Sequence, residues 1–204
     1  MRSKQSTTYT CPCHALVLAA GQGIRFGSDK RQARLTSGQT VLNATLARAL
    51  EHFDEVTVVL RPGDDRQTLD IDSRVTVVWA QQAASGLSAS LAAGIAALRG
   101  SSAQAAAVLL GDMPWIAQST LRTLCANAHA HRIVMPVHQG QRGHPVIFGR
   151  AFWAALEQVQ GDQGGRQVVA ANAQACMRVE VDDPGVLLDI DTPADLAGRF
   201  SSPG

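Results

Sequence analysis

A glycine-rich loop with two cations is the part of this sequence whose residue types are best suited to chemistry. Gly21, Gly23 and Gly27 follow an apolar run, and Arg25 and Lys30 lie within and just after them. Because glycine lets a chain turn sharply and approach a ligand closely, the backbone N–H groups of such a loop can surround an anion. Positive charges beside these groups could stabilise the charge that develops on a phosphorus under attack. The loop therefore predicts a polyphosphate-binding site.

The glycine spacing by itself is also compatible with a dinucleotide-binding loop, which is a weak signal. A dinucleotide loop has little use for two nearby cations, because its pyrophosphate does not react. The second expected strand, 56–60, runs into Arg61-Pro62-Gly63, without an acidic residue to hold a ribose. No Gly-Lys-Ser/Thr sequence follows the loop, so the Walker pattern is missing too. Lys4 and Lys30 are the only lysines among many arginines, which favours a functional role for Lys30 as a compact charge on phosphate oxygens.

Two aspartates follow apolar segments further along the chain. Asp112 comes directly after an apolar strand and a glycine, and Asp191 comes at a second strand-to-helix transition. A carboxylate at the end of a strand beside a phosphate loop suits Mg²⁺. The alternatives are a cap or turn at Asp112 before the helix expected at 117–130, and an N-cap at Asp191 or Thr192. We favour Asp112 as a metal ligand, with Asp191 as its partner.

Three further segments carry residues that could bind ligands. At one expected helix start, Gly86, Ser88 and Ser90 could contact a base or ribose, or Ser88 could serve only as a cap. His144 begins an expected strand, where a lone histidine is more often structural. At another helix start, glycine N–H groups and an arginine could hold the phosphate of a second substrate, or form a cap with a surface arginine. That last segment contains Asp162, Gly164 and Arg166.

Strand-like apolar runs alternate with helical patterns along the chain. Strands are expected at 14–20, 55–61, 74–79, 105–110, 132–137 and 144–148, with a last pair at 176–182 and 186–190. Helices are expected at 40–52, 64–70, 87–99, 117–130, 150–158, 165–172 and 193–199. This alternation predicts an α/β fold with three layers, in which helices cover both faces of a mostly parallel, Rossmann-like sheet. Ligands bind at the carboxyl ends of the strands in such folds, where the loops at 21–30, 80–90, 111–115 and 189–192 lie.

Length and composition are those of one globular domain. The chain has 204 residues, of which 46% are hydrophobic, and a formal net charge of +1. This charge provides no global attraction to nucleic acid or to a membrane. No apolar run approaches the ~20 residues that span a bilayer. The start of the chain is polar and lacks the apolar core of a signal peptide, so we expect a flexible tail at 1–12, a single domain at 13–204 and a cytoplasmic location.

The four cysteines raise the question of a metal or redox site. Cys11-Pro-Cys13-His14 is dense in ligand atoms, but the spacing is not Cys-x-x-Cys and the sequence shows no second cluster to complete four ligands. We therefore expect thiols in a tail and at a strand edge. Cys125 and Cys176 are expected to be small apolar residues of the core.

Taken together, the motifs resemble the MobA-like nucleotidyltransferases, and most closely the molybdenum cofactor cytidylyltransferases. The resemblance covers residues 14 to 199, with the motifs in the expected order. It is carried by Leu18-Ala-Ala-Gly21-x-Gly23-x-Arg25-x-Gly27-x-x-Lys30, Gly86-Leu-Ser88-Ala-Ser90, Gly111-Asp112-Met-Pro114, Gly143-His-Pro145, Gly161-Asp162-x-Gly164-x-Arg166 and Asp189-Ile-Asp191-Thr-Pro193. The fold that this implies is that of the nucleotide-diphospho-sugar transferases, so that 13–204 is a nucleotidyltransferase domain.

By this resemblance, the expected reaction is Mg²⁺-dependent transfer of CMP from CTP to the phosphate of molybdenum-loaded molybdopterin. The products are molybdopterin cytosine dinucleotide and pyrophosphate. The first loop reads Ala19-Ala20-Gly21, whereas guanylyl relatives tend to carry Ala-Gly-Gly, and this favours CTP. The alternatives are a guanylyltransferase or another NTP transferase that acts on a sugar or alcohol phosphate, and a chaperone that inserts cofactor into a molybdenum hydroxylase.

The resemblance also implies roles for single residues. Arg25, Lys30 and Asp112 are the expected catalytic residues, and Asp112 and Asp191 the expected ligands of Mg²⁺. The expected nucleotide-binding residues are Ala19, Ala20, Gly21, Gln22, Gly23, Arg25, Lys30, Gly86, Ser88 and Ser90. The expected acceptor-binding residues are His144, Asp162, Gly164 and Arg166. The expected partners are CTP and molybdopterin, with an apo-molybdenum hydroxylase as a recipient, and neither nucleic acid nor a membrane.

Overall fold

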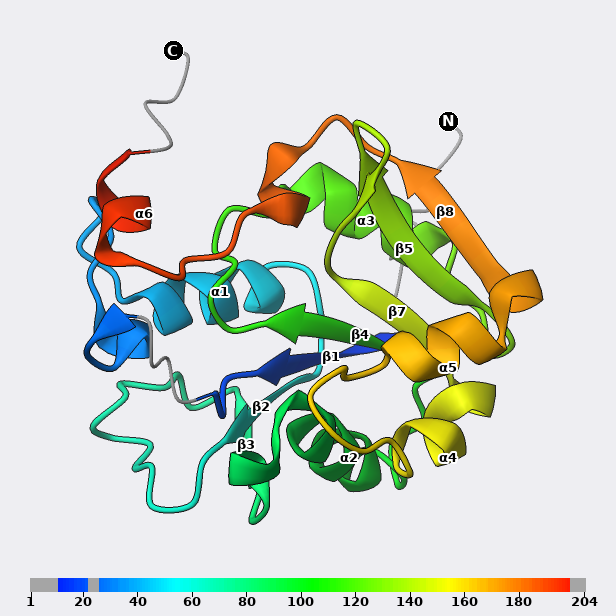
Figure 1. The fold of residues 1–204 in the computed structure, drawn as a ribbon, viewed down its shortest axis with the longest axis horizontal. Coiled ribbons are helices and arrows are strands. Elements are labelled where there is room, and N and C mark those ends of the chain that lie inside the picture. Colours follow the sequence, from blue (N-terminus) through cyan, green and yellow to red (C-terminus); the bar gives the residue numbers. More distant parts are fainter. Residues whose placement is uncertain (1–10, 22–25, 199–204) are drawn as a thin grey trace, which may run out of the picture.

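One eight-stranded sheet runs through the molecule, and its central strands are parallel (Figure 1). The computed structural model describes residues 11–21 and 26–198. The strands are β1 (Cys13–Leu18), β2 (Val56–Leu60), β3 (Thr76–Trp79), β4 (Ala105–Leu110), β5 (Ile133–His138), β6 (Gln141–Arg142), β7 (Val146–Gly149) and β8 (Cys176–Glu180). Their order is β3-β2-β1-β4-β7-β5-β6, with β8 beside β5. β7 is antiparallel to both β4 and β5, so the sheet is mostly but not wholly parallel.

Helices cover both faces of this sheet, which gives the predicted three layers. In Figure 1, α1 (Val41–Leu50) and α3 (Gln118–Ala126) lie above the strands, and α2 (Leu87–Ala97), α4 (Trp153–Leu156) and α5 (Arg166–Ala171) lie below. The alternation of side chains along β1 explains this arrangement. Ala15 and Val17 belong to the core that contains Leu42 and Leu46 of α1. Leu16 and Leu18 belong to the core that contains Leu91 and Ile95 of α2. Every residue of β1 is buried, as expected for a strand between two helical layers.

Two predicted elements are wrong. Residues 64–70 form turns instead of a helix. The Asp65 carboxylate accepts from the N–H of Thr68, as at a helix start, but Asp70 adopts a left-handed conformation with φ of 51° and ends the segment after one turn. Residues 186–190 do not form a strand. A 3-10 turn at Pro184–Leu187 replaces its first part, and β8 pairs in parallel with β5 instead.

Smaller differences concern element ends. The helix predicted at 150–158 begins as a 3-10 turn at Arg150–Phe152 and its α-helical part ends at Leu156. The last helix, α6, spans Pro193–Gly198. No helix in the described ranges is both long and apolar enough to cross a membrane.

The strand order brings two loops together at one edge of the sheet. The chain leaves β1 toward β2 and later returns on the other side of β1 as β4, so the loops after β1 and β4 are neighbours. The N–H of Gly111 donates to the carbonyl of Leu18 at 2.9 Å. A Cβ atom at Gly111 would lie 2.9 Å from the Cβ of Ala19, so this approach requires glycine. The carboxylate of Asp112 is thereby delivered beside the segment that follows β1.

Candidate active site

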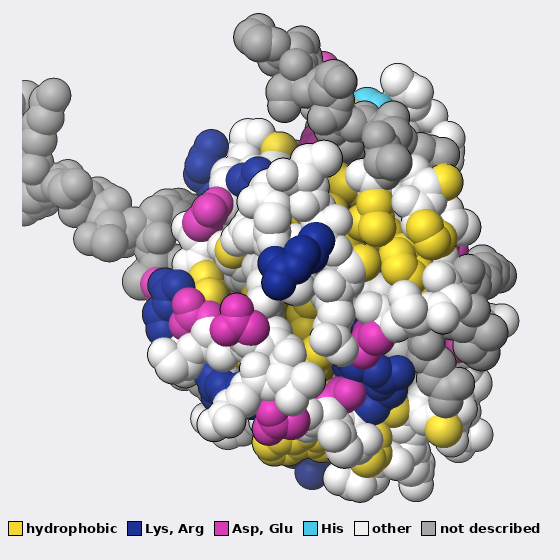
Figure 2. Space-filling model, turned by 90° about the vertical axis from the view of Figure 1, so that its left-hand side faces the viewer, with side chains coloured by type: hydrophobic (Ala, Val, Ile, Leu, Met, Phe, Trp, Pro, Cys, Tyr) yellow, Lys and Arg dark blue, Asp and Glu magenta, His cyan; other side chains and the backbone are white. Residues whose placement is uncertain are grey.

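A cavity of about 880 Å³ opens where β1 and β4 end. We call it the loop cavity. Its lining includes backbone from the start of the glycine loop, the first residues of α2 and several charged side chains. These residues include Ala19, Ala20, Gly21, Lys30, Gly86, Ser90, Asp112, Asp189 and Asp191. On this side of the molecule, acidic and basic side chains lie next to one another (Figure 2).

Lys30 lies between two carboxylates of the loop cavity. Its Nζ donates to Asp112 Oδ2 at 2.6 Å and to Asp191 Oδ1 at 3.1 Å. Burial acts to lower the pKa of Lys30, but the two carboxylates outweigh it, and the pKa is raised above its usual value. Lys30 is therefore a permanent cation at the point where segments far apart in the sequence meet.

The segment that carries Asp191 is held against Asp112 by the backbone. The N–H of Ile190 donates to the carbonyl of Asp112 at 3.1 Å. Asp195, in the first turn of α6, accepts hydrogen bonds from the N–H groups of Asp191 and Thr192. Asp195 thus supports the backbone at this helix start, and the Asp191 carboxylate contacts Lys30.

Asp112 does not cap α3, which removes the structural alternative considered from the sequence. Asp183 takes that role, because its Oδ2 accepts from the N–H of Ala117 at 2.9 Å and from the hydroxyl of Thr120 at 2.7 Å. The second carboxylate oxygen of Asp112, Oδ1, is buried and has no hydrogen-bond partner in the described part of the chain. A buried oxygen of this kind is costly unless something binds it.

These carboxylates fit a divalent cation. Asp189 lies beside them, and burial together with the charges of Asp191 and Asp112 raises its pKa. Three carboxylates therefore surround a single lysine at this edge of the loop cavity. Hard oxygen ligands with a free lone pair are the donor set that Mg²⁺ and similar cations prefer. Asp112 and Asp191 are the residues best placed to hold one.

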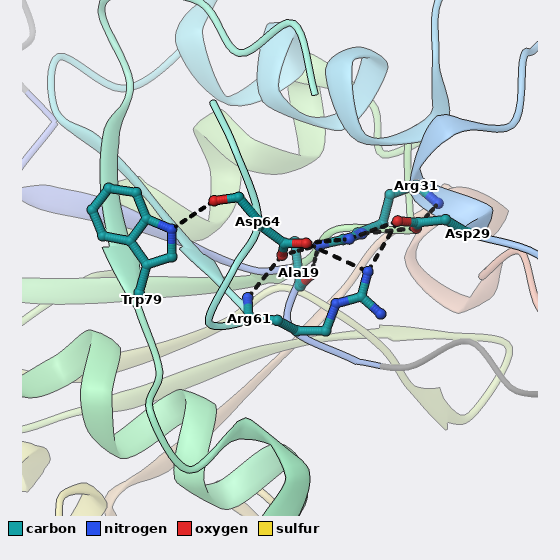
Figure 3. Close-up of polar contacts among 6 residues, drawn as sticks. All are labelled: Ala19, Asp29, Arg31, Arg61, Asp64 and Trp79. Atoms are coloured by element: carbon teal, nitrogen blue, oxygen red, sulfur yellow. Dashed lines mark hydrogen bonds and ion pairs between the residues drawn. The ribbon is translucent and has the colours of Figure 1, made fainter. Parts of the chain in front are cut away.

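A buried arginine that sequence reasoning missed supports the segment around Lys30 (Figure 3). Arg31 is only 5% exposed. Its guanidinium donates to Asp29 Oδ2 at 2.6 Å, to Asp64 Oδ1 at 2.8 Å and to the carbonyl of Ala19 at 3.0 Å. Hydrogen bonds from Arg31 lower the pKa of Asp29 to about 2. Arg61 adds a hydrogen bond to Asp29 at 2.9 Å.

This network joins the ends of two neighbouring strands to the residue before Lys30. Ala19 follows β1, and Arg61 and Asp64 follow β2. The indole of Trp79, at the end of β3, donates to the carbonyl of Asp64 (Figure 3). The available signal in the sequence was the set of opposite charges after the first two strands, but their pairing depends on the fold.

The predicted residues of the glycine loop are described only in part. Gln22, Gly23 and Arg25 lie outside the described residues. Ala19, Ala20 and Gly21 line the loop cavity, as does Gly86, whose φ of +107° suits glycine. Ser90 also contributes to the lining.

Ser88 occupies a different environment from the one expected. Its side chain is fully buried and does not line the loop cavity. Its hydroxyl donates to the carbonyl of Gln160 and accepts from the N–H of Gly164. The predicted cap by Ser88 is wrong, because the Asp162 carboxylate accepts from the N–H of Leu87 at the start of α2. Ser88 thus holds the glycine segment before α5 against α2.

A second cavity, of about 1040 Å³, adjoins the loop cavity. We call it the α5 cavity. Leu18, Leu87, Leu110, Asp162 and Arg166 line both cavities. His144 and Gly164 line the α5 cavity, and burial lowers the pKa of His144. All four predicted acceptor-binding residues therefore line this cavity.

The α5 cavity also contains two arginines that the sequence did not single out. Arg142 on β6 and Arg178 on β8 join Arg166 in its lining. Apolar side chains such as Met135 and Phe148 supply other parts of the wall. Three guanidinium groups beside an apolar wall are suited to a ligand with an anionic group and a flat or hydrophobic body.

Comparison with known proteins identifies the family. The MobA-like NTP transferase domain matches residues 15–176. The molybdenum cofactor cytidylyltransferase of Escherichia coli (strain K12) is 25% identical over 183 residues, which are 89% of this chain and 92% of the relative. The purine catabolism protein PucB of Bacillus subtilis (strain 168) is 27% identical over 188 residues, covering 87% of this chain and 91% of the relative.

Solved structures agree with this assignment. A protein from Mycobacterium sp. strain JC1, the homologue of a Mycobacterium tuberculosis protein, has a TM-score of 0.80 and 29% identity, covering 91% of this chain and 93% of its own. The M. tuberculosis protein in complex with manganese has a TM-score of 0.73 and 26% identity, covering 90% and 95%. The family match spans most of the chain, including the loop cavity's strands. The chain belongs to the MobA-like NTP transferase family and is a nucleotidyltransferase.

Proposed function

We propose that this enzyme transfers CMP from CTP to the phosphate of molybdenum-loaded molybdopterin, in a reaction that depends on Mg²⁺. The observation that carries the proposal is the pair of adjoining cavities, with Lys30, Asp112 and Asp191 grouped in the loop cavity and three arginines in the α5 cavity. The similarity to the E. coli cytidylyltransferase supports molybdopterin as the acceptor, and Ala19-Ala20-Gly21 supports CTP.

The loop cavity is the proposed nucleotide site. Backbone N–H groups of the glycine loop, with Arg25, would hold the β- and γ-phosphates, and Gly86 and Ser90 lie where the nucleoside would contact α2. The α5 cavity is the proposed acceptor site. Its arginines would bind the phosphate of molybdopterin, and its apolar wall would contact the ring system.

In the proposed reaction, an oxygen of the acceptor phosphate attacks the α-phosphorus of CTP. A new P–O–P bond forms, the bond from the α-phosphorus to the oxygen that joins it to the β-phosphorus breaks, and pyrophosphate leaves with that oxygen and the electron pair of the bond. The attacking oxygen is already anionic, so no strong general base is needed. Positioning and charge stabilisation therefore supply most of the rate.

Lys30 has the central part in this scheme. Its Nζ now neutralises Asp112 and Asp191, the same carboxylates that would hold Mg²⁺. Asp112 and Asp191 would hold the divalent cation, and Lys30, which contacts both carboxylates, would stabilise the charge of the α-phosphate during attack. Bound Mg²⁺ would act as a Lewis acid on phosphate oxygens. A manganese complex of a similar protein supports a divalent cation in this fold.

Substrate profiling tests the proposal. Pyrophosphate release is measured with Mg²⁺ and molybdenum-loaded molybdopterin, with CTP, GTP or ATP as the nucleotide. We expect release with CTP and at most weak release with GTP or ATP. Pyrophosphate release with GTP alone would mean that the enzyme uses GTP and not CTP. Pyrophosphate release that requires a sugar or alcohol phosphate in place of molybdopterin would contradict the proposed acceptor.

A further inference from the structure

Three thiols and an imidazole gather at the edge of the sheet opposite to the loop cavity. Cys11 precedes β1 and Cys13 is its first residue, at the right-hand end of this strand in Figure 1. His52 follows the end of α1, and Cys125 lies in the last turn of α3. One ligand atom each from Cys11, His52 and Cys125 lies within 4.8 Å of the other two. The Cys13 thiol lies beside those of Cys11 and Cys125.

The polar atoms of this cluster are not fully satisfied by the protein. Nε2 of His52 is buried and has no hydrogen-bond partner among the residues described. Burying such a nitrogen costs free energy unless it forms a hydrogen bond or coordinates a metal. All four cysteines of the chain are free thiols in the structure.

The spacing of three of these ligand atoms is close to that of a zinc site. Zinc binds sulfur at about 2.3 Å and nitrogen at about 2.0–2.1 Å, so ligand atoms in a tetrahedron lie roughly 3.5–3.8 Å apart. The ligand atoms of Cys11, His52 and Cys125 lie within 4.8 Å of one another, so a contraction of at most about 1 Å, within the reach of side-chain rotation, would bring them to that spacing. The backbone is already fixed here, because the carbonyl of Pro12 accepts hydrogen bonds from the N–H groups of Gln104 and Ala105.

The type of ligand selects the type of metal. Thiolates and imidazole favour zinc and similar soft or borderline cations over Mg²⁺, which prefers oxygen. His14, which adjoins Cys13 in the sequence, is engaged elsewhere: its ring nitrogens contact Glu55 Oε2 and Thr57 Oγ1. The imidazole of the cluster therefore comes from His52 and not from the neighbouring histidine, and Cys13 is the residue that could supply a fourth ligand.

We propose that Cys11, Cys13, His52 and Cys125 form a structural zinc site. The site would fasten the start of β1 to the ends of α1 and α3, which pack on the same face of the sheet. Cys11 and His52 are only partly buried, so the cation can enter from solvent. The sequence motif Cys-Pro-Cys supplies only half of the ligands, and the fold brings the other half from two separate helices.

Metal analysis of the full chain tests this proposal. The protein is purified in reducing buffer without chelator, loaded with Zn²⁺, desalted and analysed by mass spectrometry for metal content. We expect one zinc per chain in the wild type, and a loss of most of it in Cys11→Ser and His52→Gln. Cys176→Ser is the matched control, because Cys176 lies on β8 outside the cluster, and it should keep the zinc. No zinc on the reduced wild type would overturn the proposal, as would equal zinc in all variants.

Two further measurements distinguish metal binding at the thiols from misfolding of the variants and from metal binding at the carboxylates of the loop cavity. Co²⁺ in place of Zn²⁺ should give sulfur-to-metal charge-transfer absorption, which oxygen ligands do not produce. In the wild type, Zn²⁺ should raise the melting temperature and protect Cys11 from a thiol reagent. Both effects should persist in Asp112→Asn. A cobalt spectrum without charge transfer, or thiols equally reactive with and without Zn²⁺, would contradict a thiolate site.

Discussion

At the scale of single residues, Lys30 balances the charge of two aspartates that are far apart in the sequence. Its ammonium group bridges Asp112 and Asp191, and its raised pKa keeps it charged. The same charge is what an α-phosphate needs while its phosphorus is attacked. One residue thus stabilises the free enzyme and, in the proposed mechanism, the transition state.

Replacing Lys30 with alanine should therefore affect turnover more than binding. We expect Lys30→Ala to lower kcat by about 10²–10³-fold, the usual cost of removing one preorganised charge donor, with a small change in KM for CTP. Steady-state pyrophosphate release measures both, and the melting temperature reports whether the fold survives. Arg74→Ala, which removes an exposed cation paired with Asp72, is the control and should leave both constants unchanged. An unchanged kcat for Lys30→Ala would remove Lys30 from the mechanism.

Asp29 gives a prediction for stability as a function of pH. Its pKa falls from the usual 3.8 to about 2 through hydrogen bonds from Arg31, so between these two pH values the folded state binds fewer protons than the unfolded state. The resulting stabilisation is complete above the unfolded pKa and is lost as the pH falls toward about 2. Asp29→Asn should cost roughly 1 kcal/mol at pH 7, after allowance for solvent screening.

Urea unfolding at several pH values checks this. The stability difference between wild type and Asp29→Asn should shrink as the pH approaches 2, because both side chains are then neutral. Asp70→Asn, at an exposed position in the neighbouring turns, serves as the comparison. A difference that stays constant from neutral to acidic pH would mean that Asp29 stabilises the fold by something other than its charge.

At the scale of elements, most strands and helices follow from the sequence because their patterns are unambiguous. β1, β2 and β4 are buried apolar runs, and they begin and end within two residues of the predicted bounds. The failure at 64–70 comes from the left-handed backbone of Asp70, and the failure at 186–190 from Asp183, whose carboxylate accepts from the N–H of Gly185 at the start of the 3-10 turn. Hydrophobic periodicity does not reveal such local conformations.

The residues of the candidate site also divide into those that the sequence could predict and those that it could not. Lys30, Asp112 and Asp191 could be selected from the sequence because each follows a recognisable strand or loop, and the structure brings them into contact. Arg31 could not be selected, because its role depends on burial and on carboxylates from other segments. Arg142 and Arg178 were missed because a very short strand and a late strand bring them to one cavity.

Gly111 tests how closely β1 and β4 must approach. We expect Gly111→Ala to destabilise the protein by about 1–3 kcal/mol, because its Cβ would press against Ala19, and to lower kcat by displacing Asp112. Thermal unfolding and pyrophosphate release measure the two effects. Gly100→Ala is the matched control, since a Cβ there meets no atom within 4 Å. Equal stability of the two variants would show that the loop can move apart at no cost.

At the scale of the whole molecule, different side chains lie at the two ends of the central strands. Carboxylates, Lys30 and the two cavities lie beyond the carboxyl ends of β1 and β4. Thiols and an imidazole lie at the amino-terminal end of β1. This separation predicts that a zinc site can stabilise the fold without entering the reaction, whereas Mg²⁺ is required for turnover.

The two cavities predict separable effects on the two substrates. Arg178→Ala should raise KM for molybdopterin by roughly 10-fold, because a charge-assisted hydrogen bond to phosphate is lost, and should leave KM for CTP unchanged. Arg48→Ala, an exposed pair partner of Glu51 on α1, is the control. A rise in KM for CTP alone would contradict this assignment and would mean that the α5 cavity binds the nucleotide.

The transfer of the α-phosphoryl group is the central claim, and a label on that phosphorus tests it most directly. CTP labelled at either its α- or its γ-phosphorus is incubated with the enzyme, Mg²⁺ and molybdenum-loaded molybdopterin, and the products are separated. The account predicts that the α-label joins the molybdopterin product and that the γ-label leaves in pyrophosphate, with both changes slowed by the same factor in Lys30→Ala. Transfer of the γ-label to the acceptor, or an α-label that never leaves free nucleotide, would contradict it.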